Sequence, residues 1–203
     1  MPSAVLRIYD NAPGLVDALL ANGDAIRDLL TSVNGFRIWG LVRTDNGGMS
    51  LTLCETAEGC QESVRLAADW IGKNLADQSI APPTVITGDV IFAIQTNRPE
   101  TQPHAVVSIF SDPPPPGLKD READLRELVA AAPGFRSSFA IGPTNTGGGV
   151  TVLVADDKAA ADAIRQRTRE YVTTKYPEAV PTTPPRIIEG QAVKRIVGAA
   201  VTA

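Results

Sequence analysis

Histidine is nearly absent from this chain, since His104 is the only one among 203 residues. A zinc site needs several histidine, cysteine or carboxylate ligands at short spacings, and His104 has neither a second histidine nor a cysteine near it in sequence. No nucleophile-elbow motif supports a catalytic triad with it. We therefore expect His104 to be a surface residue, and we expect neither a metal nor a cofactor.

The chain also has few cysteines, a small net charge and no long apolar runs. The two cysteines, Cys54 and Cys60, suit a reducing compartment as free thiols. The net charge is −4 and the basic residues are scattered, so neither nucleic acid nor a membrane surface is an expected partner. No signal peptide is recognisable. No apolar run approaches the length of roughly 20 residues that is needed to cross a bilayer. The expected location is the cytoplasm.

The chain does contain an internal repeat. Gly35-Phe36-Arg37 returns 99 residues later as Gly134-Phe135-Arg136. Pro82-Pro83 precedes an apolar run, and Pro184-Pro185 precedes a similar run 102 residues later. Two related units therefore follow one another in the same order.

Hydrophobic periodicity predicts the order β-α-β-β-α-β in both units. The elements expected in the first unit are strands over 4–9, 36–43, 49–55 and 85–94 and helices over 15–32 and 60–76. Those expected in the second are strands over 105–110, 135–141, 150–155 and 187–197 and helices over 118–132 and 159–174. The glycine-rich stretches between the middle strands lack the Lys-Ser or Lys-Thr of a phosphate loop, so we interpret them as hairpin turns at positive φ.

The polar stretch 96–103 contains two prolines and is predicted to be a linker between a repeat over 1–95 and a repeat over 104–203. A β-α-β-β-α-β unit forms a four-stranded antiparallel sheet with both helices on one face. The other face must be covered, because a large apolar patch is unfavourable in water. The predicted fold class is α+β, with two tandem ferredoxin-like βαββαβ units packed sheet-to-sheet as a fused dimeric α+β barrel.

The sequence resembles the dimeric α+β barrel superfamily, especially proteins related to antibiotic biosynthesis monooxygenases. The resemblance rests on Gly35-Phe36 opening a strand, on the stretches 51–56 and 62–70, and on Gly88-Asp89-Val90. It implies a pseudo-dimer within one chain and leaves further self-association open. Members that work without metal hold a polyphenolic substrate in a protein pocket, whereas haem-degrading members use a histidine ligand. This chain has no clear match to either set.

Strand alternation separates an apolar face, suited to the helices, from a mixed face. If the mixed faces point into the barrel, they line a ligand pocket, to which Thr52 and Asp89 are possible additions. The candidate ligand-binding residues are Arg7, Tyr9, Arg37 and Trp39. The alternative is that these side chains lie at an interface between sheets.

The two repeats differ at these positions. Serine and phenylalanine replace Arg7 and Tyr9 in the second unit, and Ser138 replaces Trp39, whereas Arg37 has the counterpart Arg136. Any function is therefore expected in the first unit. Trp70 is predicted to pack in the core, and Cys60 to be an unreactive thiol.

Two functions from different classes remain open. One is small-molecule binding by an α+β barrel protein without evident catalytic machinery. The alternative is a cofactor-independent monooxygenase acting on an aromatic or polyketide-like substrate. The lack of an evident general base near the candidate residues favours binding.

Overall fold

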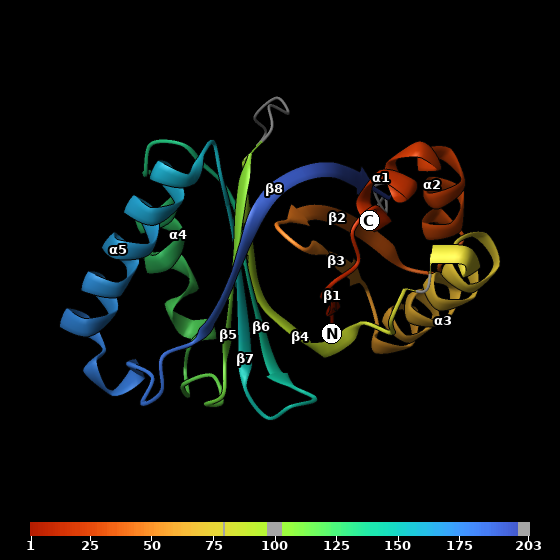
Figure 1. Ribbon diagram of the computed structural model, residues 1–203. Coiled ribbons are helices and arrows are strands. Elements are labelled where there is room, and N and C mark those ends of the chain that lie inside the picture. Colours follow the sequence, from red (N-terminus) through yellow and green to blue (C-terminus); the bar gives the residue numbers. More distant parts are fainter. Residues whose placement is uncertain (79, 97–102, 199–203) are drawn as a thin grey trace. The chain divides into compact units, whose positions relative to one another are not determined.

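A computed structural model of the protein describes residues 1–78, 80–96 and 103–198 (Figure 1). The chain forms two compact units: Met1–Asp89 with the described residues from Val193 onward make unit 1, and Val90–Ala192 makes unit 2. The predicted linker lies mostly outside the described residues. The division into repeats over 1–95 and 104–203 stays a prediction.

The sheet of unit 1 is antiparallel and centred on β1 (Ser3–Tyr9), a strand that is buried along its whole length. β1 pairs with β3 (Gly47–Cys54) on one side and with β4 (Thr84–Gln95) on the other. β2 (Phe36–Thr44) pairs with β3 and is followed by β8 (Arg186–Val197). The strand order in unit 1 is therefore β4-β1-β3-β2-β8.

Helices cover one face of this sheet (Figure 1). They are α1 (Leu15–Ala21), α2 (Gly23–Thr31) and α3 (Ala57–Asn74), the last followed by a 3-10 turn, η1 (Ala76–Gln78). The single helix predicted over 15–32 is wrong, because Asn22 interrupts it with φ −105° and ψ 29°. The Asn22 side-chain amide donates to the Ala18 carbonyl oxygen at 2.8 Å, which caps α1 and lets the chain restart as α2.

Unit 2 repeats the plan. Its strands are β5 (His104–Phe110), β6 (Phe135–Thr144) and β7 (Gly149–Ala155), with the order β8-β5-β7-β6-β4. Its helices are α4 (Glu122–Ala130) and α5 (Lys158–Lys175), with 3-10 turns η2 (Lys119–Arg121) and η3 (Pro177–Ala179). β4 and β8 are each divided between the two units.

The predicted order β-α-β-β-α-β is thus present in both units. The predicted fold class is confirmed: this is an α+β protein of the dimeric α+β barrel class, built from two tandem ferredoxin-like units.

The two long helices begin at equivalent side-chain caps. Thr56 accepts a hydrogen bond from the Gly59 amide at 3.2 Å, and Asp157 accepts one from the Ala160 amide at 2.8 Å. Such caps satisfy amide groups that have no partner within the helix. α3 therefore begins three residues before the predicted start at position 60, which places Cys60 within its first turns.

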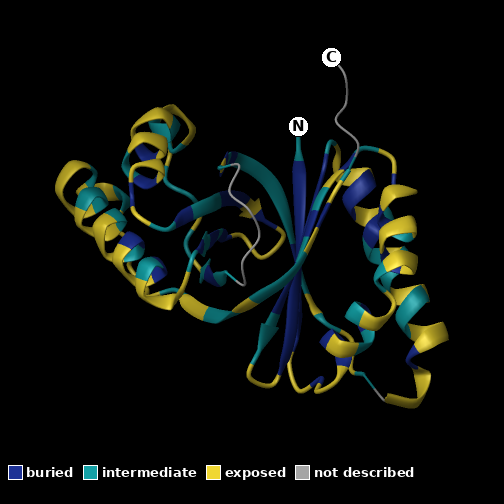
Figure 2. Ribbon diagram, turned by 90° about the horizontal axis from the view of Figure 1, so that it is seen from above, coloured by how far each residue is buried: buried dark blue, intermediate teal, exposed yellow. Residues whose placement is uncertain are grey.

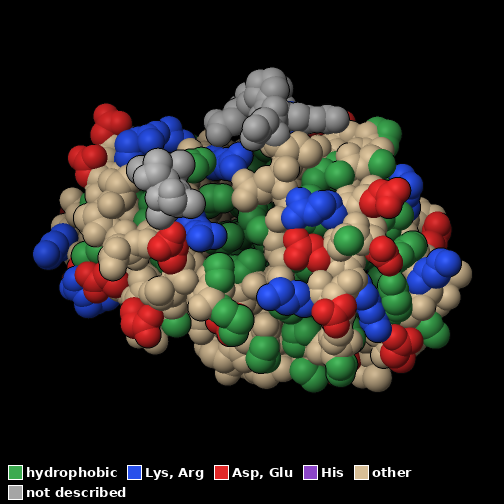
Figure 3. Space-filling view, turned by 180° about the vertical axis from the view of Figure 1, so that it is seen from behind, with side chains coloured by type: hydrophobic (Ala, Val, Ile, Leu, Met, Phe, Trp, Pro, Cys, Tyr) green, Lys and Arg blue, Asp and Glu red, His purple; other side chains and the backbone are tan. Residues whose placement is uncertain are grey.

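Each unit has its own core between helices and sheet. In Figure 2 the strands are largely buried, and the helices are buried on one side and exposed on the other. The largest fully buried side chains of the unit 1 core include Leu15, Val5 and Val16, and those of unit 2 include Phe135, Ile94 and Val106. On the face shown in Figure 3, positive and negative side chains are interspersed.

Among the described residues, no helix combines the length and the apolar character that crossing a membrane requires.

Candidate functional site

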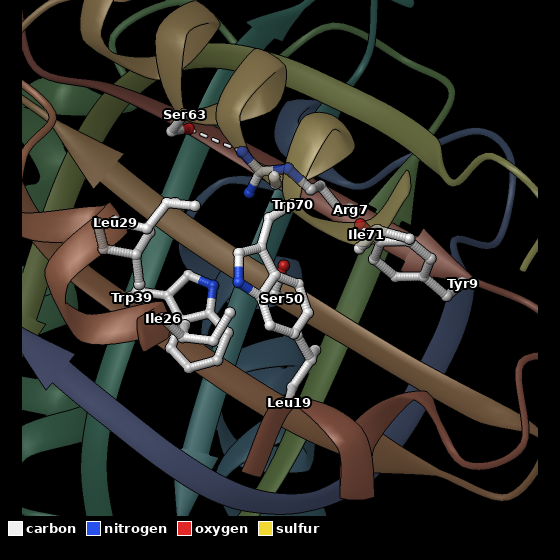
Figure 4. A pocket seen from close by; sticks show the side chains of 12 residues that line it. Arg7, Tyr9, Leu19, Ile26, Leu29, Trp39, Ser50, Ser63, Trp70 and Ile71 are labelled. Atoms are coloured by element: carbon white, nitrogen blue, oxygen red, sulfur yellow. Dashed lines mark hydrogen bonds between the residues drawn. The ribbon is translucent and has the colours of Figure 1, made fainter. Parts of the chain in front are cut away.

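A cavity of about 40 Å³ lies inside unit 1, between the sheet and its three helices (Figure 4). Its strand residues come from β1, β2 and β3, and its helix residues from α1, α2 and α3. Leu29, Trp70 and Ile71 are only half-buried, so the cavity reaches the surface between α2 and α3. The lining residues are Arg7, Tyr9, Leu19, Ile26, Leu29, Leu30, Trp39, Ser50, Ser63, Ala67, Trp70 and Ile71.

Three of the four candidate residues, Arg7, Tyr9 and Trp39, line this one cavity. The expectation that their mixed strand faces point away from the helices is wrong, since the cavity is lined by helix residues as well. Trp39 packs in the same core cluster as Leu15 and Leu30. The register of β2 shifts between Phe36 and Ile38. Such a bulge changes which side chains of a strand share a face, so that Trp39 points toward the helices.

Arg7 occupies the polar end of the cavity. Its side chain is buried, and the residue is only 3% exposed. One terminal nitrogen donates to the Thr52 hydroxyl at 2.9 Å. The other donates to the Ser63 hydroxyl at 2.7 Å (Figure 4). The Ser63 hydroxyl in turn donates to the Cys60 carbonyl oxygen at 2.7 Å. These contacts fix the guanidinium between β3 and α3.

The charge of Arg7 has no carboxylate beside it within the described part of the chain. The ionisable groups that act on it are Tyr9, Cys60 and Cys54. Burial lowers the pKa of the Arg7 guanidinium, because a charge is less stable away from water. Burial also raises the pKa of Tyr9, although the Arg7 charge opposes this shift, so the phenol is neutral near pH 7.

The two cysteines form a buried thiol pair next to Arg7. The Cys60 thiol donates a hydrogen bond to Cys54, which lowers the pKa of Cys54 and raises that of Cys60. A raised pKa keeps Cys60 protonated, in agreement with the unreactive thiol that the sequence predicts. Both sulfurs are closed off from solvent.

Arg37, the fourth candidate residue, lies outside the cavity. Its guanidinium is 3.5 Å from a carboxylate oxygen of Glu55, and its side chain is 49% exposed. Unit 2 contains the same pair, with Arg136 and Asp156 joined at 2.6 Å. Because the ion pair is repeated, it belongs to the scaffold of both units.

Of the two possible additions to the site, Thr52 lies beside the cavity and Asp89 lies away from it. Thr52 holds Arg7, whereas Asp89 accepts a hydrogen bond from Ser3 at 3.1 Å and does not line the cavity. His104 is half-buried at the start of β5, with its Nε2 3.4 Å from a Glu189 carboxylate oxygen. The sequence predicts a surface residue here, whereas the His104 side chain is 18% exposed and lies beside Glu189.

The equivalent place in unit 2 contains no charged residue, and two of the three positions compared are apolar. The paired strands put Ser108 at the position of Arg7 and Leu153 at the position of Thr52. Counting from the helix caps, Ile164 of α5 stands at the position of Ser63 of α3. Leu153 and Ile164 lie in the unit 2 core. The fold therefore closes without a buried cation at this place, and unit 1 has one in addition.

Arg37→Ala is expected to change the free energy of unfolding by less than about 1 kcal/mol, because exposed ion pairs contribute little. The variant should keep the wild-type midpoint in urea unfolding, which tryptophan fluorescence can follow because Trp39 and Trp70 both lie in unit 1. A much larger loss would mean that Arg37 has a further structural role beyond the pair with Glu55.

Ser63 and Trp70 are among the cavity residues that sequence reasoning missed. Trp70 was predicted as core, and it does pack against the core cluster, but it also lines the cavity. Ser63 gave no signal of its own, because a serine inside a predicted helix is ordinary. A comparison of the repeats could have found it, since an isoleucine stands at its place in the second unit.

No protein-family model matches this chain, and no curated protein matches it. Solved structures do match. A proposed monooxygenase from Fusobacterium nucleatum has a TM-score of 0.65 and 13% identity, covering 97% of this chain and 94% of that one. An anthrone oxidase-like protein has a TM-score of 0.59 and 14% identity, covering 100% of this chain and 95% of that one.

A third structure is an uncharacterised ferredoxin-fold protein from Listeria monocytogenes, related to antibiotic biosynthesis monooxygenases. Its TM-score is 0.52 and its identity is 9%, with 96% of each chain covered. The predicted resemblance is therefore confirmed at the level of the fold. This chain has the α+β fold of the antibiotic biosynthesis monooxygenase-like proteins along almost its whole length.

Proposed function

We propose that the protein binds a small molecule in the cavity of unit 1. The observation that carries this proposal is the difference between the repeats: the cavity gathers a buried arginine and both tryptophans of the chain, whereas the equivalent place in unit 2 contains Ser108, Leu153 and Ile164. Apolar walls with a few convergent polar groups are typical of ligand sites. The site then consists of Arg7, Tyr9 and Trp39, supported by Thr52 and Ser63.

The size of the cavity limits the ligand. A volume of about 40 Å³ is enough for only a few water-sized groups. A larger ligand would have to move the half-buried side chains at the mouth, Leu29, Trp70 and Ile71. These side chains come from α2 and α3 where the two helices face the solvent. Moving them would therefore require less free energy than moving the buried side chains of the cavity.

The experiment is a thermal-shift screen with small aromatic and aliphatic compounds, with flavin, haem and quinones included. A compound at ten times its Kd should raise the melting temperature of the wild type by about 3 °C. Ala67→Leu adds bulk to the cavity wall on α3 and should abolish the shift. Arg37→Ala, outside the cavity, should keep it. A shift that survives Ala67→Leu would place the ligand elsewhere and overturn the proposal.

The alternative is a cofactor-independent monooxygenase with an aromatic or polyketide-like substrate. Its support is the likeness to a proposed monooxygenase and to an anthrone oxidase-like protein. The described residues of the cavity lining include no carboxylate and no histidine, so they offer no ordinary general base, and we place binding first. Oxygen uptake with an anthrone separates the two functions. A rate above that of buffer, lost in Ala67→Leu, would establish the oxygenase.

A further inference from the structure

The cation of Arg7 is left with unused hydrogen-bonding capacity. A guanidinium carries five N–H donors, and Arg7 makes two hydrogen bonds, to Thr52 and Ser63. Its Nε is buried and has no hydrogen-bond partner in the part of the chain that the structure describes. Buried polar groups in native proteins are nearly always paired, so an unpaired one needs an explanation, and a ligand that enters the neighbouring cavity provides one.

The two existing partners are hydroxyl groups, which bring no negative charge. Their positions hold the guanidinium in one orientation and leave its remaining N–H groups for another acceptor. The planar edge of a guanidinium matches the two oxygens of a carboxylate, and such paired contacts are among the strongest hydrogen bonds in proteins.

A purely structural role does not explain Arg7. The equivalent position in unit 2 is Ser108, and the residues around it pack as an ordinary apolar core. A buried charge without a counter-ion is costly, so a chain that needed only a core would be better served by the apolar solution of unit 2.

We propose that the cavity binds a small monocarboxylate, with the carboxylate on the free N–H groups of Arg7 and the apolar part against Trp39 and Trp70. This inference rests on the proposed function and names its ligand class. A single buried cation balances one negative charge, and the small volume suits a carboxylate better than a doubly charged phosphate. The half-buried apolar mouth then receives the aliphatic or aromatic remainder of the ligand.

The test uses two acids, propionate and benzoate, each paired with its neutral amide. Binding is followed by the fluorescence of Trp39 and Trp70, which both line the cavity and are the only two tryptophans of the chain. At least one acid should bind about tenfold more tightly than its amide, because hydrogen bonds to charged groups exceed neutral ones. Arg7→Met should remove that preference, and Arg7→Lys should keep part of it, since the charge stays but the planar edge is lost.

The outcomes separate this inference from the proposed function. Equal binding of acid and amide, or an acid preference that survives in a folded Arg7→Met protein, overturns the carboxylate site while small-molecule binding in the cavity stands. Binding of an amide without binding of either acid also overturns the carboxylate site. If neither acid binds and no compound in the thermal-shift screen binds, both the carboxylate site and the proposed small-molecule binding are overturned. Far-UV circular dichroism shows whether each variant is folded. If Arg7→Met is not folded, the acid preference of Arg7→Lys is used in its place.

Discussion

Gly47→Ala is expected to lower the free energy of unfolding by about 3 kcal/mol, the upper end of the usual range for overpacking. A methyl group at this position would overlap the backbone carbonyl oxygen of Tyr9, with the Ala12 amide nitrogen 3.3 Å away. Both neighbours are backbone atoms, so neither can turn aside as a side chain would. The end of β3 would have to move away from the end of β1. Urea unfolding followed by tryptophan fluorescence measures the loss.

Gly72→Ala is the matched control within unit 1. Gly72 lies inside α3 and has open space where the methyl group would go. Alanine is the better helix former, so this variant should be more stable by about 0.5–1 kcal/mol. A Gly47→Ala protein as stable as wild type would show that β1 and β3 do not approach as closely as described.

The repeat provides an independent check on the same requirement. In unit 2, a methyl group at Gly148 would overlap the carbonyl oxygen of Phe110, the counterpart of Tyr9. Gly148→Ala should therefore be damaging as well, and thermal unfolding followed by circular dichroism would detect it. Both glycines are required by this close approach between neighbouring strands, and only secondarily by the hairpin turn.

This role of glycine shows where sequence reasoning stops. The glycine-rich stretch between the second and third strands, residues 45–48, is one of the two predicted hairpin turns in which Asn and Gly take positive φ. Asn46 and Gly47 are not among the described residues with positive φ, whereas Gly147 in the longer turn of unit 2 is, at 85°. The local pattern predicted the hairpin correctly. The contact that requires the glycine joins residues far apart in sequence, so no local pattern could reveal it.

The fold was predictable because its signals are local and occur twice. Period-two strands, helical stripes and the repeated Gly-Phe-Arg each indicate an element without knowledge of the rest of the chain. The break at Asn22 and the cap at Thr56 were missed, since each depends on one side chain bonding to the backbone nearby. Errors of this kind shift the ends of helices and leave the order of elements unchanged.

Sequence reasoning grouped Arg7, Tyr9 and Trp39, which do line one cavity, but it pointed their side chains away from the helices. Alternation grouped Arg7 with Tyr9 and set them apart from the apolar face, which is correct. The choice of which face meets the helices rested on polarity, and polarity misleads when a cavity with a buried cation lies beneath the helices. Arg37 was included because it alternates with Trp39, but the bulge between Phe36 and Ile38 breaks that alternation.

Ser63→Ala is expected to lower the free energy of unfolding by about 2 kcal/mol, because hydrogen bonds to charged groups contribute roughly 1.5–3 kcal/mol. The loss leaves the buried Arg7 with Thr52 as its single hydrogen-bond partner. Urea unfolding of the free protein measures the change. The cost should fall below about 0.5 kcal/mol in a protein that already carries Arg7→Met, since no cation is then left unsatisfied.

Arg7→Met alone should leave stability unchanged or raise it by about 1–4 kcal/mol, as replacement of buried charges by apolar side chains often does. That result, joined to a loss of carboxylate binding, would mean that unit 1 keeps a destabilising cation for its ligand, whereas unit 2 has the more stable apolar core. If Arg7→Met instead unfolded the protein, and Ser63→Ala cost the same with or without Arg7, the arginine would be a structural member of the core. The difference between the two repeats would then reflect two ways of filling the same space.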